Sequence, residues 1–249
     1  MRPSTPSVPL WQRARHLSDA ELSVIPWMGI LSAAEQAHAA DALRAATAQA
    51  GDLLCRFGRP PTYWFGVIDG LLKMSNDDSQ PTPITFTGMP PGAWFGEGTL
   101  LKREPYRYNV QALRRSTVAG LPIDTFHELL DSSISFNRFV MRQLNERLSQ
   151  FIGAVVIDRL TDSDSRVARG LAAMFHPVLY PGVGDLLRIT QQEIGYVVGL
   201  SRQRVNEALR RLQDRRLIRI EYGGVRVLDL DGLRNALFSA ETNGADATR

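Results

Sequence analysis

The sequence predicts an α+β protein with three successive parts: a β-rich unit, a long helix, and a C-terminal unit that combines short helices with a β-hairpin. Three observations predict this order. Short apolar runs separated by glycine and proline fill residues 51–122, a helical apolar stripe occupies 134–160, and a charged helical stretch followed by a hairpin pattern occupies 189–228. With 249 residues, the chain is long enough for one large domain or two modest ones.

The composition excludes several classes of protein. Hydrophobic residues make up 44% and charged residues 22%, which is typical of a folded soluble chain. The single cysteine, Cys55, rules out an intramolecular disulfide, a cysteine-based zinc site and a four-cysteine iron–sulfur cluster. The longest apolar runs are far shorter than the roughly 20 residues of a membrane span, and no signal peptide is visible. We therefore expect a cytoplasmic protein without a membrane partner.

The first part, residues 1–44, is expected to be a proline-rich leader followed by a helix. Ser32 and Glu35 have the spacing of a capping box, and the alanine-rich stretch behind them predicts a helix that continues to Ala50. Residues 45–133 are expected to form the β-rich unit, a sandwich, roll or barrel, in which Asp69 and Gly70 form a hairpin turn. The predicted strands lie at 53–57, 63–68, 71–74, 84–87, 110–113 and 118–121.

The helix expected at residues 134–161 carries an apolar stripe with a heptad repeat, three and four residues apart. The residues of this stripe are Met141, Leu144, Leu148, Phe151 and Val155. A second stripe lies beside it, so one stripe can pack on the chain's own β-rich unit and the other on a partner helix. The alternative is one wide amphipathic helix that packs only within its own domain, but two adjacent stripes favour a homodimer with the first stripe as its seam.

A break at residues 161–164 predicts a hinge, and Asp162 or Asp164 can cap the helix that opens the last part, 162–249. Further on, Thr190 and Glu193 form a capping box for a short helix, a glycine-containing turn follows, and Ser201 caps a second helix. This pattern predicts a helix-turn-helix.

Two β-like runs on either side of Gly223 and Gly224 predict a hairpin, which would complete a winged helix. Residues 201–219 contain seven arginines against Glu207 and Asp214, a net charge of +5. The alternative, an unrelated helical pair and hairpin, is disfavoured by this concentration of positive charge.

The segments Ile189-Thr-Gln-Gln-Glu-Ile-Gly195 and Val198-Gly199-Leu-Ser201-Arg202 resemble the helix-turn-helix signature of the Crp/Fnr family of transcription regulators. Gly96 and Glu97, followed ten residues later by Arg107, are similar to that family's phosphate-binding cassette. The resemblance covers roughly residues 45–235. It implies a cyclic-nucleotide-binding jelly roll (a β-roll), a long dimerisation helix and a C-terminal winged helix-turn-helix.

The resemblance also implies a non-enzymatic DNA-binding regulator, with double-stranded DNA of near-palindromic sequence, a second copy of the chain and RNA polymerase as partners. By their hydrogen-bonding groups, Arg202 suits guanine, Gln203 suits adenine and Glu207 suits cytosine. The complete set of candidate DNA-binding residues is Thr190, Gln192, Ser201, Arg202, Gln203, Arg204, Asn206, Glu207 and Arg210.

The candidate ligand-binding residues are Gly96, Glu97, Arg107 and Tyr108. Arg107 can pair with a phosphate and Glu97 can accept a hydrogen bond from a ribose hydroxyl; the alternative is an ion pair between the two. By the resemblance, Phe151 and Ile152 stand at the two positions that reach the adenine of a bound cyclic nucleotide. Neither offers a hydrogen bond to a base edge, so we expect an effector other than cyclic AMP. A cyclic nucleotide of another kind, a cyclic dinucleotide or a pocket filled by its own side chains remain open. So does a nucleotide-binding module that regulates a partner without binding DNA. No metal site is expected.

Overall fold

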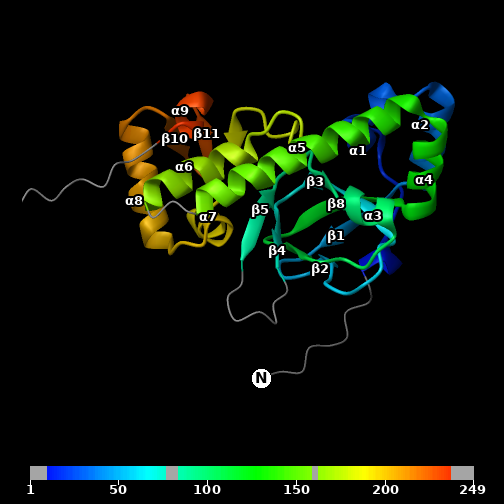
Figure 1. Ribbon diagram of the computed structural model, residues 1–249, viewed down its shortest axis with the longest axis horizontal. Helices are drawn as coiled ribbons and strands as arrows, with labels where there is room; N and C mark the ends of the chain where they lie inside the picture. The colour runs from blue at the N-terminus through cyan, green and yellow to red at the C-terminus, as the bar shows by residue number, and fades with distance from the viewer. Residues whose placement is uncertain (1–9, 77–83, 159–161, 237–249) are drawn as a thin grey trace, which may run out of the picture.

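The computed structural model describes residues 10–76, 84–158 and 162–236 (Figure 1). The predicted capping box is present, because the Ser32 hydroxyl accepts from the Glu35 backbone N–H and the Glu35 carboxylate accepts from the Ser32 N–H. The predicted continuation of this helix to Ala50 is wrong, since strand β1 follows it and pairs with β8. Alanine's helix preference is weak enough for strand pairing to override it. The elements of this segment are η1 (Leu10–Arg13), α1 (Asp19–Ser23), η2 (Met28–Ile30), α2 (Ala33–Ala42) and β1 (Arg44–Ala48).

The β-rich unit is a roll of two four-stranded antiparallel sheets, with strand orders β1-β8-β3-β6 and β2-β7-β4-β5. The six predicted strands are confirmed, and β1 and β6 are additional. The remaining strands are β2 (Leu53–Cys55), β3 (Tyr63–Asp69), β4 (Leu72–Ser75), β5 (Thr85–Met89), β6 (Trp94–Phe95), β7 (Asn109–Ala112) and β8 (Ser116–Pro122).

The turn at Asp69 and Gly70 does not join two paired strands, so the predicted hairpin is wrong. Gly70 has a left-handed φ of +111°, as a tight turn requires. However, β3 pairs with β8 and β6, whereas β4 pairs with β5 and β7. The turn therefore carries the chain from one sheet to the other and helps to close the roll.

Three helices accompany the roll: α3 (Glu97–Lys102), α4 (Ile123–Ser132) and the long α5 (Ile134–Asp158). Figure 1 shows α5 running from the roll to the C-terminal unit. Its first half is anchored by an aromatic cluster in which Phe136 meets Trp27 and Trp64 at ring-centroid distances of 5.3 and 5.5 Å. Both tryptophans and Phe136 are fully buried, so the start of α5 is fixed to the N-terminal segment and the roll.

The C-terminal unit confirms the predicted helix-turn-helix and hairpin. Its elements are α6 (Ser163–Met174), β9 (Leu186–Leu187), α7 (Gln191–Val198), α8 (Arg202–Asp214), β10 (Ile218–Glu221), β11 (Gly224–Val227) and α9 (Leu230–Arg234). Asp162 caps α6. Glu221 pairs with Gly224, so the hairpin turn consists of Tyr222 and Gly223, one residue earlier than predicted.

The roll and the C-terminal unit share one continuous hydrophobic core, in which residues of β5 contact α6 and α7. The contact is close at two glycines: a Cβ on Gly92 would lie 2.6 Å from the Gly182 nitrogen, and one on Gly182 would lie 2.9 Å from the Pro91 oxygen. Arg114 adds a polar link, because its guanidinium contacts the Glu193 carboxylate at 3.1 and 3.2 Å. The C-terminal unit is therefore docked against the roll.

Candidate functional site

The helix-turn-helix is set by local sequence signals. The Thr190 hydroxyl accepts from the Glu193 N–H at the start of α7, and the Ser201 hydroxyl accepts from the Arg204 N–H at the start of α8. Between them, Gly199 has a φ of +67°. A Cβ on Gly195 would lie 2.7 Å from the Leu200 oxygen, so only glycine allows the turn to pass this close to α7.

Helix α8 buries one face and exposes the other. Val205, Ala208, Leu209 and Leu212 are buried, so the polar side of the helix is directed away from the core. Three exposed arginines on this helix have no ion-pair partner within the described part of the chain: Arg202, Arg204 and Arg210. Arg211 differs, because it donates to Asp164 of α6 at 2.7 Å and holds the two helices together. The unpaired arginines give α8 a positive outer surface that suits phosphates and guanine edges.

Three candidate DNA-binding side chains are hydrogen-bonded within the protein. Gln203 donates to Glu207 at 3.1 Å, and Asn206 accepts from Gln191 at 3.0 Å. DNA would have to replace these bonds. The other candidates divide into the caps Thr190 and Ser201, the arginines, and Gln192, which is exposed on α7. All nine predicted residues thus lie on α7, on α8 or at their N-terminal caps.

The hairpin tip carries a residue that the sequence pattern did not single out. Tyr222 is fully exposed in the turn, and Arg219 is exposed on β10. Arg226 instead lies between two carboxylates, Glu221 and Asp185, and stiffens the hairpin. An aromatic side chain directly before a glycine turn is the only sequence signal that could have pointed to Tyr222.

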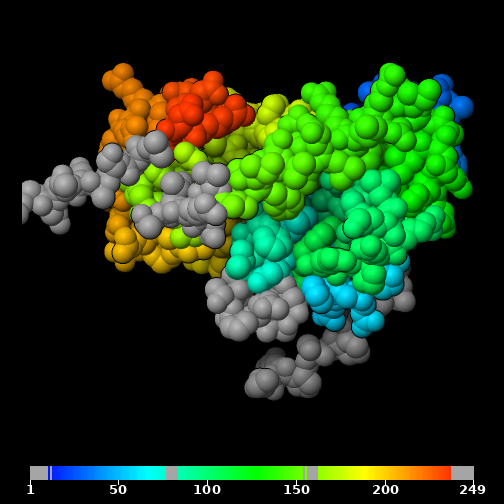
Figure 2. Space-filling model, viewed as in Figure 1, coloured from blue at the N-terminus to red at the C-terminus, as the bar shows by residue number. Residues whose placement is uncertain are grey.

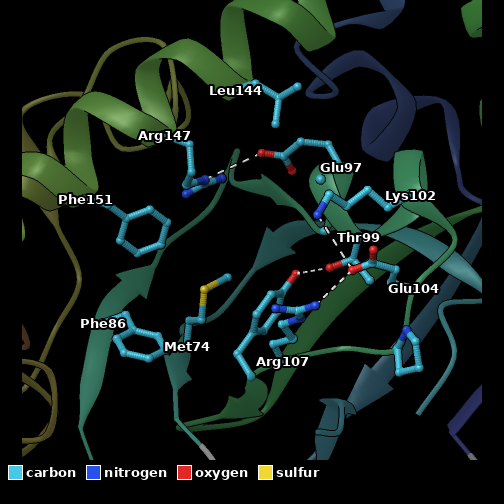
Figure 3. Close-up of a pocket in the computed structure, with 14 residues that line it drawn as sticks. Met74, Phe86, Glu97, Thr99, Lys102, Glu104, Arg107, Leu144, Arg147 and Phe151 are labelled. Carbon is cyan, nitrogen blue, oxygen red and sulfur yellow. Dashed lines mark hydrogen bonds and ion pairs between the residues drawn. The ribbon is translucent and has the colours of Figure 1, made fainter. Parts of the chain in front are cut away.

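The roll contains a cavity of about 510 Å³ beside α5 (Figure 3). This volume lies within the range of small-molecule sites, roughly 300–1,000 Å³. One end of the cavity is apolar, where Phe86 of β5 and Phe151 of α5 meet edge to face at 6.3 Å. The other end is polar and carries Lys102 and Arg107. This open volume does not fit the alternative of a pocket filled by its own side chains, which the sequence left open.

Glu97 is buried at the α5 side of the cavity, where Arg147 of α5 lies beside it (Figure 3). The Arg147 Nε is 3.6 Å from one Glu97 oxygen, and Arg147 also donates to the Trp94 carbonyl at 2.7 Å and to the Tyr180 hydroxyl at 3.2 Å. The second Glu97 oxygen, Oε2, has no hydrogen-bond partner among the described residues. Glu97 can therefore accept a further hydrogen bond in the cavity.

The alternative of a Glu97–Arg107 ion pair is wrong. Arg107 lies at the mouth of the cavity with 80% of its side chain exposed, and its partner is Glu104 at 3.3 Å. Arg147 is the charged cavity residue that the sequence pattern did not single out. It was detectable as the one basic position within the apolar stripe between Leu144 and Phe151.

Tyr108 is half-buried near the Glu97–Arg147 ion pair, and its hydroxyl lies 3.3 Å from the Thr99 hydroxyl. Burial raises the pKa of Tyr108, so the phenol is protonated at neutral pH and can donate a hydrogen bond. Gly96 precedes α3 with a φ of +99°, which places Glu97 at the first position of that helix. The four predicted ligand-binding residues therefore line a single cavity.

Cys55 is fully buried, and desolvation raises the pKa of its thiol, so it is an unreactive core residue. Within the ranges that the structure describes, no group of histidine, cysteine and carboxylate side chains has the arrangement of a metal site. The same ranges contain no helix with the length and hydropathy required to cross a membrane.

Helix α5 exposes an apolar stripe on the side away from the roll, and Figure 2 shows this helix as a ridge on the molecular surface. Leu144 and Phe151 of the predicted seam are half-buried and line the cavity, so they expose less apolar surface than its other members. Ile152, which the resemblance placed at the ligand, is exposed on this stripe and is not among the residues that line the cavity. The exposed members, including Met141, Leu148 and Val155 as predicted, are Ile134, Met141, Leu148, Ile152 and Val155.

Comparison with known proteins matches both the roll and the C-terminal unit to family models. The family model of the cyclic nucleotide-binding domain matches residues 46–133, and that of the Crp-like helix-turn-helix domain matches residues 165–236. The chain is 28% identical over 173 residues to the cAMP-activated global transcriptional regulator CRP of Haemophilus influenzae, covering 66% of this chain and 75% of that one. It is also 28% identical over 204 residues to the transcriptional regulator SdrP of Thermus thermophilus, covering 79% and 94%.

A solved structure shows the same fold. FixK2 from Bradyrhizobium japonicum aligns with a TM-score of 0.61 at 15% identity, covering 79% of this chain and 98% of that one. A cyclic-nucleotide-binding roll joined by a long helix to a Crp-like helix-turn-helix defines a DNA-binding transcriptional regulator. The chain belongs to the Crp/Fnr family of such regulators.

Proposed function

We propose that the chain acts as a cytoplasmic homodimer that binds a near-palindromic DNA site and regulates transcription together with RNA polymerase. The exposed, arginine-rich face of α8 carries this proposal, and the apolar stripe on α5 supports the dimer. In a two-fold dimer, two α8 helices would enter successive major grooves about 34 Å apart. We divide the chain accordingly into an N-terminal segment (1–44), a sensory roll (45–133), a dimerisation helix (134–161) and a DNA-binding unit (162–249).

In this proposal Arg202 contacts guanine, Gln203 contacts adenine and Glu207 accepts from cytosine. Selection of bound sequences from random double-stranded DNA tests it. A palindrome with two half-sites spaced by one helical turn is expected. If the folded protein enriches no sequence, or only a single half-site, the proposal that a dimer contacts two half-sites is contradicted.

We further propose that the cavity binds an anionic ligand of the cyclic nucleotide or cyclic dinucleotide class. Lys102 and Arg107 share Glu104 as their carboxylate partner, so the mouth keeps a net positive charge. The unpartnered Oε2 of Glu97 suits a ligand hydroxyl, and Phe86 and Phe151 suit the flat face of a base. Phe151 cannot hydrogen-bond to the edge of adenine. For this reason we propose an effector other than cyclic AMP, although the relative from Haemophilus influenzae is named as cAMP-activated.

Calorimetric titration of the purified protein with cyclic AMP, cyclic GMP and cyclic di-GMP tests the ligand. Binding that is lost in Arg107→Ala and kept in Arg103→Ala supports the site, because Arg103 is exposed nearby but does not line the cavity. Micromolar binding of cyclic AMP that also tightens DNA binding contradicts the proposed selectivity. If no nucleotide binds, the protein is an effector-independent regulator.

A further inference from the structure

A second, smaller cleft lies on the opposite side of α5 from the roll cavity, where α5 meets α6 and α9 of the DNA-binding unit. Figure 1 shows these three helices close together at the junction of the two units. The cleft has a volume of about 250 Å³, below the roughly 300–1,000 Å³ of sites for drug-sized ligands. Its size therefore fits a small ligand rather than a nucleotide.

The cleft is lined by basic and uncharged side chains, with no carboxylate among its described lining residues. Arg169 of α6 is the central feature. Its guanidinium makes no ion pair or hydrogen bond with the described residues, and its Nε is buried without a partner. Leaving a buried N–H donor of a cation unpaired costs free energy of folding. The Arg169 guanidinium would therefore be stabilised by a negatively charged hydrogen-bond acceptor.

The surrounding groups also favour an anion. Arg234 of α9 lines the cleft, and its carboxylate partner Asp231 is highly exposed. Such a surface ion pair contributes little free energy, so Arg234 can exchange Asp231 for an anion in the cleft. Ser149 of α5 adds a hydroxyl donor. Gly153 keeps the α5 wall open, since a Cβ there would meet nothing within 4 Å.

His176 lines the cleft but does not supply its charge. The His176 Nδ1 accepts from the backbone N–H groups of Val178 and Leu179 at 3.3 and 3.2 Å, so the neutral ring carries its proton on Nε2. That nitrogen lies 3.3 Å from the Glu146 carboxylate. Burial lowers the pKa of His176, which agrees with a neutral ring. The positive field in the cleft comes from the two arginines.

We propose that this cleft is a second effector site, which binds a small phosphate-type anion between Arg169 and Arg234. The anion would connect the dimerisation helix to the DNA-binding unit at the hinge, and would thereby hold the unit in the orientation seen here. This site is separate from the nucleotide cavity and does not depend on the identity of the ligand bound there.

The test is calorimetric titration of the full-length protein with inorganic phosphate at constant ionic strength, balanced with chloride. We expect Arg169→Gln to weaken phosphate binding at least tenfold. Arg169→Lys should retain most of the affinity, because it keeps the charge. Two controls are exposed arginines that line neither the roll cavity nor this cleft: Arg103→Gln and Arg142→Gln should leave phosphate binding unchanged.

A second variant keeps the proposal testable if Arg169→Gln does not fold. Gly153→Leu places a side chain in the open part of the cleft and should also abolish phosphate binding, while circular dichroism reports the same helix content. No phosphate binding by the wild-type protein overturns the proposal. So does binding that survives both Arg169→Gln and Gly153→Leu, or binding that is lost equally in Arg103→Gln or Arg142→Gln.

Discussion

Replacing Leu148 by glutamate is the sharpest test of how two copies of the chain associate. Leu148 lies in the middle of the α5 stripe, and 60% of its surface is exposed in the single chain. Burying a leucine fully is worth about 1.5–3 kcal/mol, so covering the exposed fraction contributes roughly 1–2 kcal/mol per subunit. Two copies of the substitution therefore remove about 2–4 kcal/mol, even before the carboxylates are considered.

The two introduced carboxylates add to this loss. They would face each other across a two-fold seam, where burial and like-charge repulsion cost several kcal/mol more. Since about 1.4 kcal/mol corresponds to a tenfold change in affinity, we expect the dissociation constant of the dimer to rise by at least roughly 100-fold.

Light scattering combined with analytical ultracentrifugation over a range of concentrations measures this change. Arg142→Glu is the matched control, because it places the same carboxylate on an exposed position of α5 outside the stripe. Leu148→Glu should be monomeric with unchanged circular dichroism, and Arg142→Glu should stay dimeric. A folded Leu148→Glu variant that remains as dimeric as the wild-type protein would refute the assignment of the stripe.

Three further predictions concern DNA reading, the ligand cavity and domain docking. Arg202→Ala should weaken binding to the selected site by about 1–3 kcal/mol and relax preference at one base pair in a gel-shift competition, whereas an equal loss on all sequences would mean a phosphate contact. Glu97→Gln, which removes the acceptor charge, should weaken the cavity ligand at least tenfold in calorimetry while leaving DNA affinity without ligand unchanged; equal ligand affinity would remove Glu97 from the site. Arg114→Ala removes the ion-pair partner of the buried Glu193 carboxylate, which keeps its hydrogen bond from the Thr190 N–H. It should lower the free energy of unfolding by about 1–3 kcal/mol, measured in urea, against no change for the exposed Arg138→Ala.

The helix-turn-helix was predictable because its signals are local. The caps Thr190 and Ser201 and the glycine between the helices each act within four residues, and the structure places them as predicted. The strand β1 was not predictable in this way. Its sequence, Arg-Ala-Ala-Thr-Ala, has no alternation of apolar and polar residues, and it forms a strand because β8 offers backbone partners about 70 residues away.

The ligand cavity was only partly predictable for the same reason. The Gly96–Glu97 pair and Arg107 are recognisable by their spacing, but the partner of each charged group depends on the fold. Glu97 meets Arg147, which lies 50 residues further along the chain on α5, and Arg107 meets its close neighbour Glu104. Spacing alone could not distinguish these pairings from a Glu97–Arg107 pair.

The shared core of the roll and the DNA-binding unit limits how far this protein can be treated as modular. Gly88 of β5 packs so closely on Met174 of α6 that an added Cβ would lie 2.7 Å from the sulfur. A fragment cut at the hinge would therefore expose an apolar face that is normally covered, and should aggregate at concentrations where the intact chain is soluble. Chimeras that exchange DNA-binding units with another regulator would need a matching β5 surface, so exchange of α8 alone is the better route to a new operator specificity.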